Sequence, residues 1–205
     1  MDKVNELRRG KVGKLIAQRI REFKDLGRKD DEEWFSELCF CVLTANSTAR
    51  LGMKIQRELG SEGFLTLPLE GLRHRLRAAG HRFPNTRARF IVEARRFRNI
   101  KSDLERFKDA RQAREWLAEN VKGIGYKESS HFLRNVGFDG VAILDRHVLS
   151  VLHEHGLIDG IPCSLTRGRY LEIERKLEGL ARKLGLTFGE LDLYLWYLKT
   201  GVVLK

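Results

Sequence analysis

Amphipathic helical periodicity runs through most of this 205-residue sequence and constrains the fold more than any other feature. A clear apolar stripe lies near the C-terminus, at Ile173, Leu177, Leu180 and Leu184. The next helix is predicted to begin at Thr187, three residues before Glu190, which is the spacing of a capping box. Sustained alternation of apolar and polar residues, which is typical of strands, is missing from the sequence. We therefore predict an all-α fold.

The charge balance points to a polyanionic partner. The sequence has 39 lysines and arginines against 28 aspartates and glutamates, a net charge of +11. Nucleic acid is the commonest partner of such a chain. The alternative is a heat-adapted surface of solvated ion pairs. No apolar run approaches the roughly eighteen residues of a membrane span, so we expect no membrane partner. The basic, amphipathic N-terminus lacks the apolar centre of a signal peptide, which favours the cytoplasm.

The three cysteines are too few for a site that needs four. A four-cysteine zinc site and a four-cysteine iron–sulfur cluster are therefore excluded, and we expect neither a metal nor a cofactor. Cys39 and Cys41 fall within an apolar helical stretch, so we interpret them as buried thiols.

The most informative segment spans residues 121–133 and reads VKGIGYKESSHFL, between two predicted helices. Gly123 and Gly125 permit a tight turn with unusual φ angles, while Ile124 can anchor that turn in the core. The unpaired N–H groups at the start of the following helix would then form a phosphate site. We predict that these three residues contact a DNA backbone. The alternative is an ordinary helix C-cap followed by a short turn.

Lys127 and Asp145 stand in register with this hairpin. Lys127 lies in the first turn of the second helix, and Asp145 follows eighteen residues later, where it can cap the next helix. A hairpin, a lysine and a capping aspartate in this order resemble the helix–hairpin–helix DNA glycosylases. The resemblance implies that Lys127 attacks the sugar and that Asp145 supports it. The structural alternatives are a surface lysine and a helix cap worth about 1 kcal/mol.

The chemistry of these enzymes explains the two residue types. Cleavage of an N-glycosidic bond builds positive charge on the sugar, which a nearby carboxylate stabilises. An amine can then capture C1′ as a Schiff base, which allows β-elimination of the 3′ phosphate.

Further segments are similar to the type 2 8-oxoguanine DNA glycosylases. These are residues 38–47 (LCFCVLTANS) and 80–88 (GHRFPNTRA), together with Trp196 and a sequence that ends at Lys205. The resemblance covers essentially the whole chain. It implies two helical lobes with the active site in the cleft between them. One lobe would span 34–124 and the other 1–33 plus 125–205, with the helix–hairpin–helix at about 111–136.

The resemblance also suggests which residues contact the DNA. Asn46 would fill the gap left by the flipped nucleotide, although it could instead end the first core helix. Arg82 and Phe83 look like a wedge that enters the base stack, with a pocket or core position left open for Phe83. His147 is interpreted as a phosphate contact or a support to Asp145. Arg134 and the arginines of 87–98 are interpreted as backbone-binding or solvated residues.

Two residues are candidates for reading the base. Trp196 offers a stacking surface, although core packing is an equal alternative. The α-carboxylate of Lys205 could accept hydrogen bonds from guanine N1–H and N2–H₂, although a frayed terminus is the simpler interpretation.

The sequence therefore predicts a bifunctional enzyme that excises 8-oxoguanine and cleaves the strand. Its partner would be double-stranded DNA containing oxidised guanine, and the enzyme would act as a monomer. A glycosylase for oxidised pyrimidines is the nearest enzymatic alternative, but many of those carry a four-cysteine cluster. Monofunctional adenine glycosylases generally lack the lysine. A non-catalytic hairpin module would explain the glycines and the charge, but it gives no role to Lys127 with Asp145.

Overall fold

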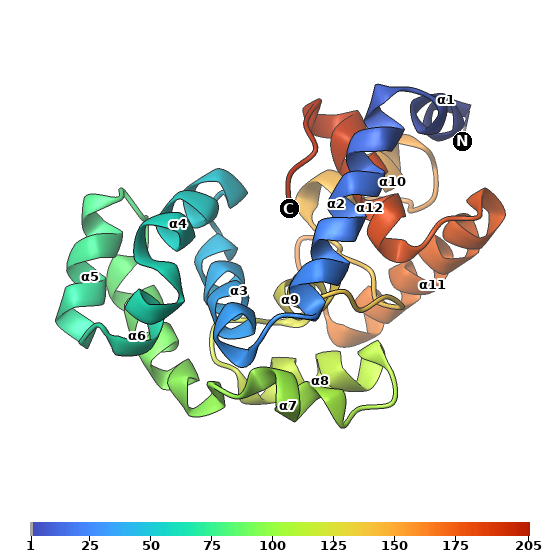
Figure 1. Ribbon diagram of the computed structural model, residues 1–205. Coiled ribbons are helices and arrows are strands. Elements are labelled where there is room, and N and C mark those ends of the chain that lie inside the picture. The colour runs from blue at the N-terminus through green and yellow to red at the C-terminus, as the bar shows by residue number, and fades with distance from the viewer. Residues whose placement is uncertain (1) are drawn as a thin grey trace.

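The computed structural model describes residues 2–205, and these residues form α-helices and one 3-10 helix, with no β-strand (Figure 1). The all-α prediction is confirmed. The elements run in this order: α1 Asp2–Arg9, α2 Lys11–Gly27, α3 Asp31–Thr44, α4 Ala49–Thr66, α5 Leu69–Ala78, α6 Pro84–Ala94, η1 Arg95–Phe97, α7 Ile100–Glu105, α8 Ala110–Asn120, α9 Tyr126–Asn135, α10 Arg146–Glu154, α11 Arg167–Leu184 and α12 Phe188–Thr200.

The predicted capping box is present at the start of α12. The Thr187 hydroxyl accepts a hydrogen bond from the Glu190 N–H at 3.2 Å, and the Glu190 carboxylate accepts one from the Thr187 N–H at 2.9 Å. Two N–H groups at the helix start are thereby satisfied, so this local signal was readable from four residues of sequence.

The buried apolar side chains form two clusters. The first is built mainly from α3 to α9, and the second from α1, α2 and α10 to α12. Figure 1 shows α4, α5 and α6 on one side of the molecule and α1, α2, α10 and α11 on the other, with α3 and α9 between them. Helix α9 serves both sides, because Phe132 and Leu133 belong to the first cluster whereas Tyr126 packs against the second.

Helix α3 is buried around its whole circumference. Its residues from Trp34 to Thr44 are all buried, which is the pattern of a helix at the centre of a core. Cys39 and Cys41 are completely buried free thiols, as predicted, and burial raises the pKa of both well above the usual range. Cys163 is exposed.

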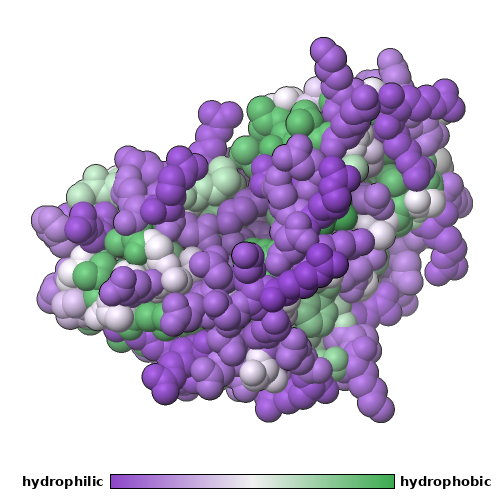
Figure 2. All heavy atoms as spheres, viewed as in Figure 1, coloured by the Kyte–Doolittle hydropathy of each residue, from purple (hydrophilic) through white to green (hydrophobic). Residues whose placement is uncertain are grey.

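The surface is predominantly polar. Figure 2 shows hydrophilic residues over most of the face that Figure 1 presents, with apolar residues in smaller patches. Among residues 2–205, every helix is too short or too polar to cross a bilayer.

Candidate active site

The hairpin connects α8 to α9 through a five-residue turn, residues 121–125. Gly123 has a φ of +91°, and a Cβ at this position would collide with the ring of Phe90. Glycine is therefore required there by the backbone and by its neighbour. Ile124 is 5% exposed and joins the first cluster, as predicted.

Gly125 differs from the expectation of an unusual φ. Its φ is −111° and its ψ is −161°, a conformation open to any residue, and a Cβ there would meet no atom within 4 Å. Neither backbone strain nor packing explains a glycine at this exposed position. As the N-cap of α9, Gly125 also has no side chain to occupy the N–H groups of the first turn.

Lys127 lies in that first turn. Its ammonium contacts the Glu128 carboxylate at 2.8 Å, and its side chain is 28% exposed. Lys127, His131 and Asn135 are spaced at i, i+4 and i+8, so they share one face of α9. This face turns toward α3, because the His131 ring packs edge-on against Phe40 with centroids 5.6 Å apart.

His131 is the buried centre around which several cations gather. Burial lowers the pKa of His131 well below its usual value, and the positive charges of Arg134, Lys127 and Lys205 lower it further. The imidazole is therefore neutral. Lys127 and Lys205, predicted separately, thus lie around the same side chain.

The side chain of Lys205 is anchored between helices. Its ammonium lies 2.7 Å from the Glu37 carboxylate on α3, 2.7 Å from the side-chain Oε1 of Gln56 on α4, and 4.3 Å from the centre of the Phe40 ring. Figure 1 shows this end of the chain beside α10, facing the side of the molecule that carries α4. Glu37 is 1% exposed and also accepts a hydrogen bond from Asn135 at 2.6 Å.

Sequence reasoning missed this polar network of His131, Asn135, Glu37 and Gln56. One signal was available, because Glu37 is a lone carboxylate in the otherwise apolar stretch of α3. A buried charge needs a partner of opposite sign, so such a residue marks a contact even before the partner is known.

Asp145 is the N-cap of α10, as predicted. Its Oδ1 accepts from the N–H groups of His147 at 2.9 Å and Val148 at 2.8 Å. Both bonds go to one oxygen, so the cap does not use Oδ2. The carboxyl is half-buried.

The chain that leads to Asp145 is held by α11. The Glu174 carboxylate accepts from the Ala142 N–H at 2.8 Å and forms a buried two-bond ion pair with Arg114 of α8, at 2.5 and 2.9 Å. The Tyr170 hydroxyl donates to the Ala142 carbonyl at 2.7 Å. Because α8 and the segment before Asp145 share Glu174, the hairpin and the carboxylate are positioned by one buried group.

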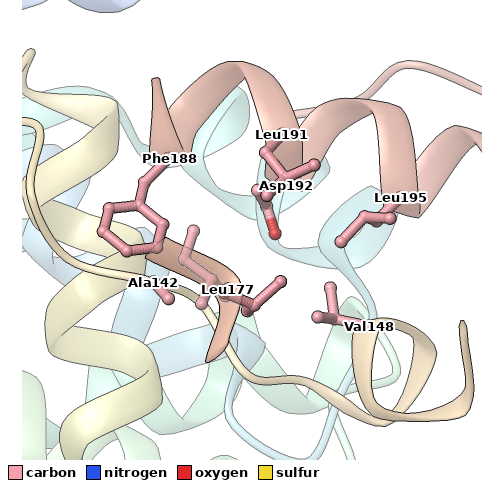
Figure 3. A pocket seen from close by; sticks show the side chains of 8 residues that line it. Ala142, Val148, Leu177, Phe188, Leu191, Asp192 and Leu195 are labelled. Atoms are coloured by element: carbon pink, nitrogen blue, oxygen red, sulfur yellow. The ribbon is translucent and has the colours of Figure 1, made fainter. Parts of the chain in front are cut away.

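The charges of Lys127 and Asp145 both affect the pKa of Asp192 on α12. Burial raises the pKa of Asp192 to about 6, and the negative charge of Asp145 raises it while the charges of Arg134 and Lys127 lower it. Both predicted catalytic residues therefore lie within electrostatic range of the same carboxyl group. The small cavity at Asp192 measures about 10 Å³, too small for a base, and Figure 3 shows Asp192 there among Leu191, Leu195 and Val148.

Trp196 and His147 are in contact. Their rings meet edge to face with centroids 4.7 Å apart, and both residues are half-buried. The indole N–H of Trp196 is buried without a hydrogen-bond partner among residues 2–205. Trp196 is therefore not a fully buried core residue, and its donor is unused.

Asn46 and the loop of Arg82 and Phe83 lie on the first cluster's side. Asn46 is exposed and adopts the left-handed conformation, with a φ of +57°, just after the end of α3. That conformation fits the alternative of a helix terminus, and the exposure leaves the side chain accessible. Phe83 is half-buried, with the Arg82 guanidinium 5.0 Å from its ring centre.

Two arginine interpretations are wrong. Arg134 is 6% exposed and forms an ion pair with Asp192, and Arg87 is 7% exposed and donates to the Ala45 carbonyl at 2.6 Å. Both side chains are internal, because each satisfies a buried acceptor that periodicity could not reveal.

Among residues 2–205, no group of three or more histidine, cysteine, aspartate or glutamate side chains is arranged to hold a metal ion.

Comparison with known proteins gives a consistent result over the whole chain. Residues 16–186 match the family model described as 8-oxoguanine DNA glycosylase. The chain is 55% identical to the 8-oxoguanine DNA glycosylase/AP lyase of Methanocaldococcus jannaschii over 203 residues, covering 99% of this chain and 98% of the relative. It is 47% identical to the protein of the same name from Aquifex aeolicus, with both chains covered completely.

Solved structures agree with these relatives. The crystal structure of the Methanocaldococcus jannaschii 8-oxoguanine glycosylase/lyase in complex with 15mer DNA containing 8-oxoguanine superposes with a TM-score of 0.97 at 54% identity, covering 100% of this chain and 98% of that one. The 8-oxoguanine DNA glycosylase of Thermotoga maritima superposes with a TM-score of 0.93 at 47% identity, covering 100% and 97%.

Proposed function

The chain belongs to the 8-oxoguanine DNA glycosylase family, and from this premise we propose that Lys127 and Asp145 carry out base excision and strand cleavage at 8-oxoguanine in double-stranded DNA. The observation that carries the assignment is that both side chains are partly exposed at helix starts, Lys127 in the first turn of α9 and Asp145 as the N-cap of α10, while the charges of both affect one buried carboxyl, Asp192. The active site then lies in the cleft between a lobe of residues 34–124 and a lobe formed by 1–33 and 125–205.

In this mechanism, positive charge develops on the deoxyribose as the glycosidic bond lengthens. The unused Oδ2 of Asp145 stabilises that charge. The unprotonated amine of Lys127 forms a bond to C1′, and the electron pair of the broken bond leaves with the base, which takes up a proton. The C1′–O4′ bond then breaks as the nitrogen loses a proton and O4′ takes one up, which opens the sugar ring and gives the Schiff base. The Schiff base acidifies the C2′ hydrogen, so loss of this proton expels the 3′ phosphate and cuts the strand.

Borohydride trapping on three lesions tests this assignment. We expect a covalent adduct with duplexes containing 8-oxoguanine and no comparable adduct with thymine glycol or uracil. Preferential trapping with thymine glycol would instead favour an oxidised-pyrimidine enzyme. Binding without any adduct would favour a non-catalytic hairpin module.

The hairpin Gly123, Ile124 and Gly125 binds the DNA backbone in this proposal. Gly125 has an ordinary φ and open surroundings, so the fold itself does not require glycine there. A close approach of phosphate to the N–H groups of the α9 first turn does explain it.

Gly125→Ala should therefore weaken duplex binding while leaving the free energy of unfolding almost unchanged. Losing one hydrogen bond to a charged phosphate costs about 1.5–3 kcal/mol, roughly a 10- to 150-fold increase in Kd. Binding measured by fluorescence anisotropy and unfolding followed by circular dichroism check the two parts. Gly123→Ala is the matched contrast, because its positive φ and the Phe90 ring predict a loss of stability. Native affinity in the Gly125 variant would contradict the phosphate role.

Asn46, Arg82 and Phe83 contact the opened duplex in this proposal, and His147 contacts the backbone or supports Asp145. Asn46 and Arg82 are both exposed, and the half-buried Phe83 carries a cation beside its ring. An apolar ring with a flanking cation is suited to entering a base stack next to phosphates.

Trp196 and Lys205 read the extruded base in this proposal, with Phe83 as an alternative contact. The Trp196 indole is partly exposed beside His147, and the Lys205 ammonium is anchored between α3 and α4 by Glu37 and Gln56. The Lys205 α-carboxylate then accepts hydrogen bonds from the guanine edge.

Residues appended after Lys205 should slow excision of 8-oxoguanine about 10- to 150-fold, because a charged acceptor is moved or neutralised, at a cost of about 1.5–3 kcal/mol. Lys205→Ala keeps the carboxylate but removes the ammonium that contacts Glu37 and Gln56, so we also expect slower excision from this variant. Lys199→Ala is the control, since Lys199 is exposed on α12 and pairs with Glu154. Single-turnover excision by an extended chain at the native rate would refute the carboxylate role.

The enzyme works as a monomer in the cytoplasm, on nucleoid DNA, in this proposal. Its net charge of +11 supports direct association with DNA. Light scattering in the presence and absence of duplex measures the stoichiometry.

A further inference from the structure

His81 connects the loop of Arg82 and Phe83 to the end of α3. It is 4% exposed and lies between α5 and α6. Its Nε2 lies 2.9 Å from the Leu43 carbonyl oxygen, and its Nδ1 lies 3.1 Å from the Phe83 backbone nitrogen. The imidazole thus joins two segments that are 38 residues apart in sequence.

The two partners fix the protonation of this ring. A carbonyl only accepts, so Nε2 carries the proton and donates it to Leu43, whereas the Phe83 N–H donates to an unprotonated Nδ1. The imidazole must therefore be neutral to make both bonds. Burial lowers the pKa of His81, and the positive charge of Arg87 lowers it further, which stabilises that neutral form.

Arg87 provides a second connection beside the first. Its guanidinium donates to the Ala45 carbonyl at 2.6 Å and lies 6.0 Å from the centre of the Phe83 ring. Leu43 and Ala45 lie at the C-terminal end of α3, where carbonyl groups lack partners within the helix and carry partial negative charge. Their capping by His81 and Arg87 explains why these polar side chains are buried.

We propose that His81 is a positioning residue that sets the loop of Arg82 and Phe83 relative to Asn46, so that both enter the duplex as one rigid unit. Asn46 directly follows Ala45, so a brace that ends on Leu43 and Ala45 also fixes the turn at Asn46. The inference rests on the proposed DNA contacts of Asn46, Arg82 and Phe83. His81 acts through these residues and does not itself contact DNA.

Three substitutions of His81 test its two hydrogen bonds, first singly and then together. The side-chain oxygen of asparagine can take the place of the histidine Nδ1. His81→Asn therefore keeps the hydrogen bond from the Phe83 N–H and loses the one to the Leu43 carbonyl. The side-chain NH₂ of glutamine can take the place of the histidine Nε2–H. His81→Gln therefore keeps the hydrogen bond to the Leu43 carbonyl and loses the one from the Phe83 N–H. His81→Phe fills the space and makes neither bond. The exposed His74 on α5 supplies the control, His74→Gln.

Two substrates isolate the step that depends on the brace. A duplex with 8-oxoguanine requires extrusion of a stacked base, whereas a duplex with a preformed abasic site does not. We expect His81→Phe to slow single-turnover excision of 8-oxoguanine about tenfold, with smaller losses for the Asn and Gln variants. Borohydride trapping at the abasic site should stay near native. The fluorescence increase of 2-aminopurine placed opposite the lesion, which reports unstacking, should fall in parallel with excision.

Two results would overturn the proposal. One is native excision and a native 2-aminopurine signal in a folded His81→Phe protein. The other is an equal loss of excision and abasic-site trapping in all three variants, which would make His81 a general support of the fold. Trapping by the native protein tests the proposed function separately, because it depends on Lys127 and not on the brace. Thermal unfolding, with all assays run well below the transition, identifies any variant that fails to fold.

Discussion

Lys127→Gln is expected to abolish the borohydride-trapped adduct with 8-oxoguanine DNA. The amide cannot form a Schiff base, so strand cleavage should fall by on the order of 10³-fold or more. Duplex binding should remain largely intact, because the hairpin N–H groups are backbone atoms that the substitution does not touch. Gel analysis of the trapped complex and anisotropy with the same duplex measure the two effects.

A neighbouring lysine supplies the control for this substitution. Lys122 lies in the hairpin turn with a side chain that is 67% exposed and paired with Glu93 at 3.0 Å. Lys122→Gln removes the same charge from the same hairpin but should trap normally. An adduct that persists in Lys127→Gln would show that another amine attacks the sugar.

Asp145→Asn should slow base excision by about 10²- to 10³-fold, or about 2.7–4 kcal/mol of transition-state stabilisation. The substitution removes negative charge where the sugar becomes positive. Stability should change little, because an asparagine oxygen can still accept from the N–H groups of His147 and Val148. Single-turnover kinetics and thermal unfolding measure the two quantities.

Asp30 offers the same exchange at a helix cap away from the chemistry. Its carboxylate accepts from the Glu33 N–H at 3.0 Å at the start of α3. Asp30→Asn should behave like the native protein in both assays. If Asp145→Asn also excises at the native rate, Asp145 is only a cap.

The local features of this molecule were predictable from sequence. The hairpin turn, the position of Lys127 and the cap at Asp145 each depend on residues within a few positions of one another, and short-range rules of backbone conformation and capping are sufficient for them. The buried Ile124 follows from the same reasoning. The one local error was Gly125, where a glycine was wrongly taken to indicate an unusual φ.

The missed features depend on contacts between distant segments. Glu37 is hydrogen-bonded to Lys205, which is 168 residues away in the sequence, and to Asn135, which is 98 residues away. His81 is hydrogen-bonded to Leu43, which is 38 residues away. A single sequence contains the partners of such contacts but not their pairing. Arg87 and Arg134 were misinterpreted for the same reason, because the sequence alone does not distinguish an arginine that satisfies a buried acceptor from one in solvent.

The rates at which the three thiols react with an alkylating reagent report on opening of the native core. All three cysteines of the sequence lie within residues 2–205, where Cys163 is exposed and the other two are fully enclosed in α3. An alkylating reagent will therefore label Cys163 at once, without any engineered site. Cys39 and Cys41 become reactive only when the core around α3 opens, because their raised pKa and their burial both suppress the thiolate. The slow phase of labelling therefore reports how often that core opens, and its change on adding duplex reports how far DNA tightens it.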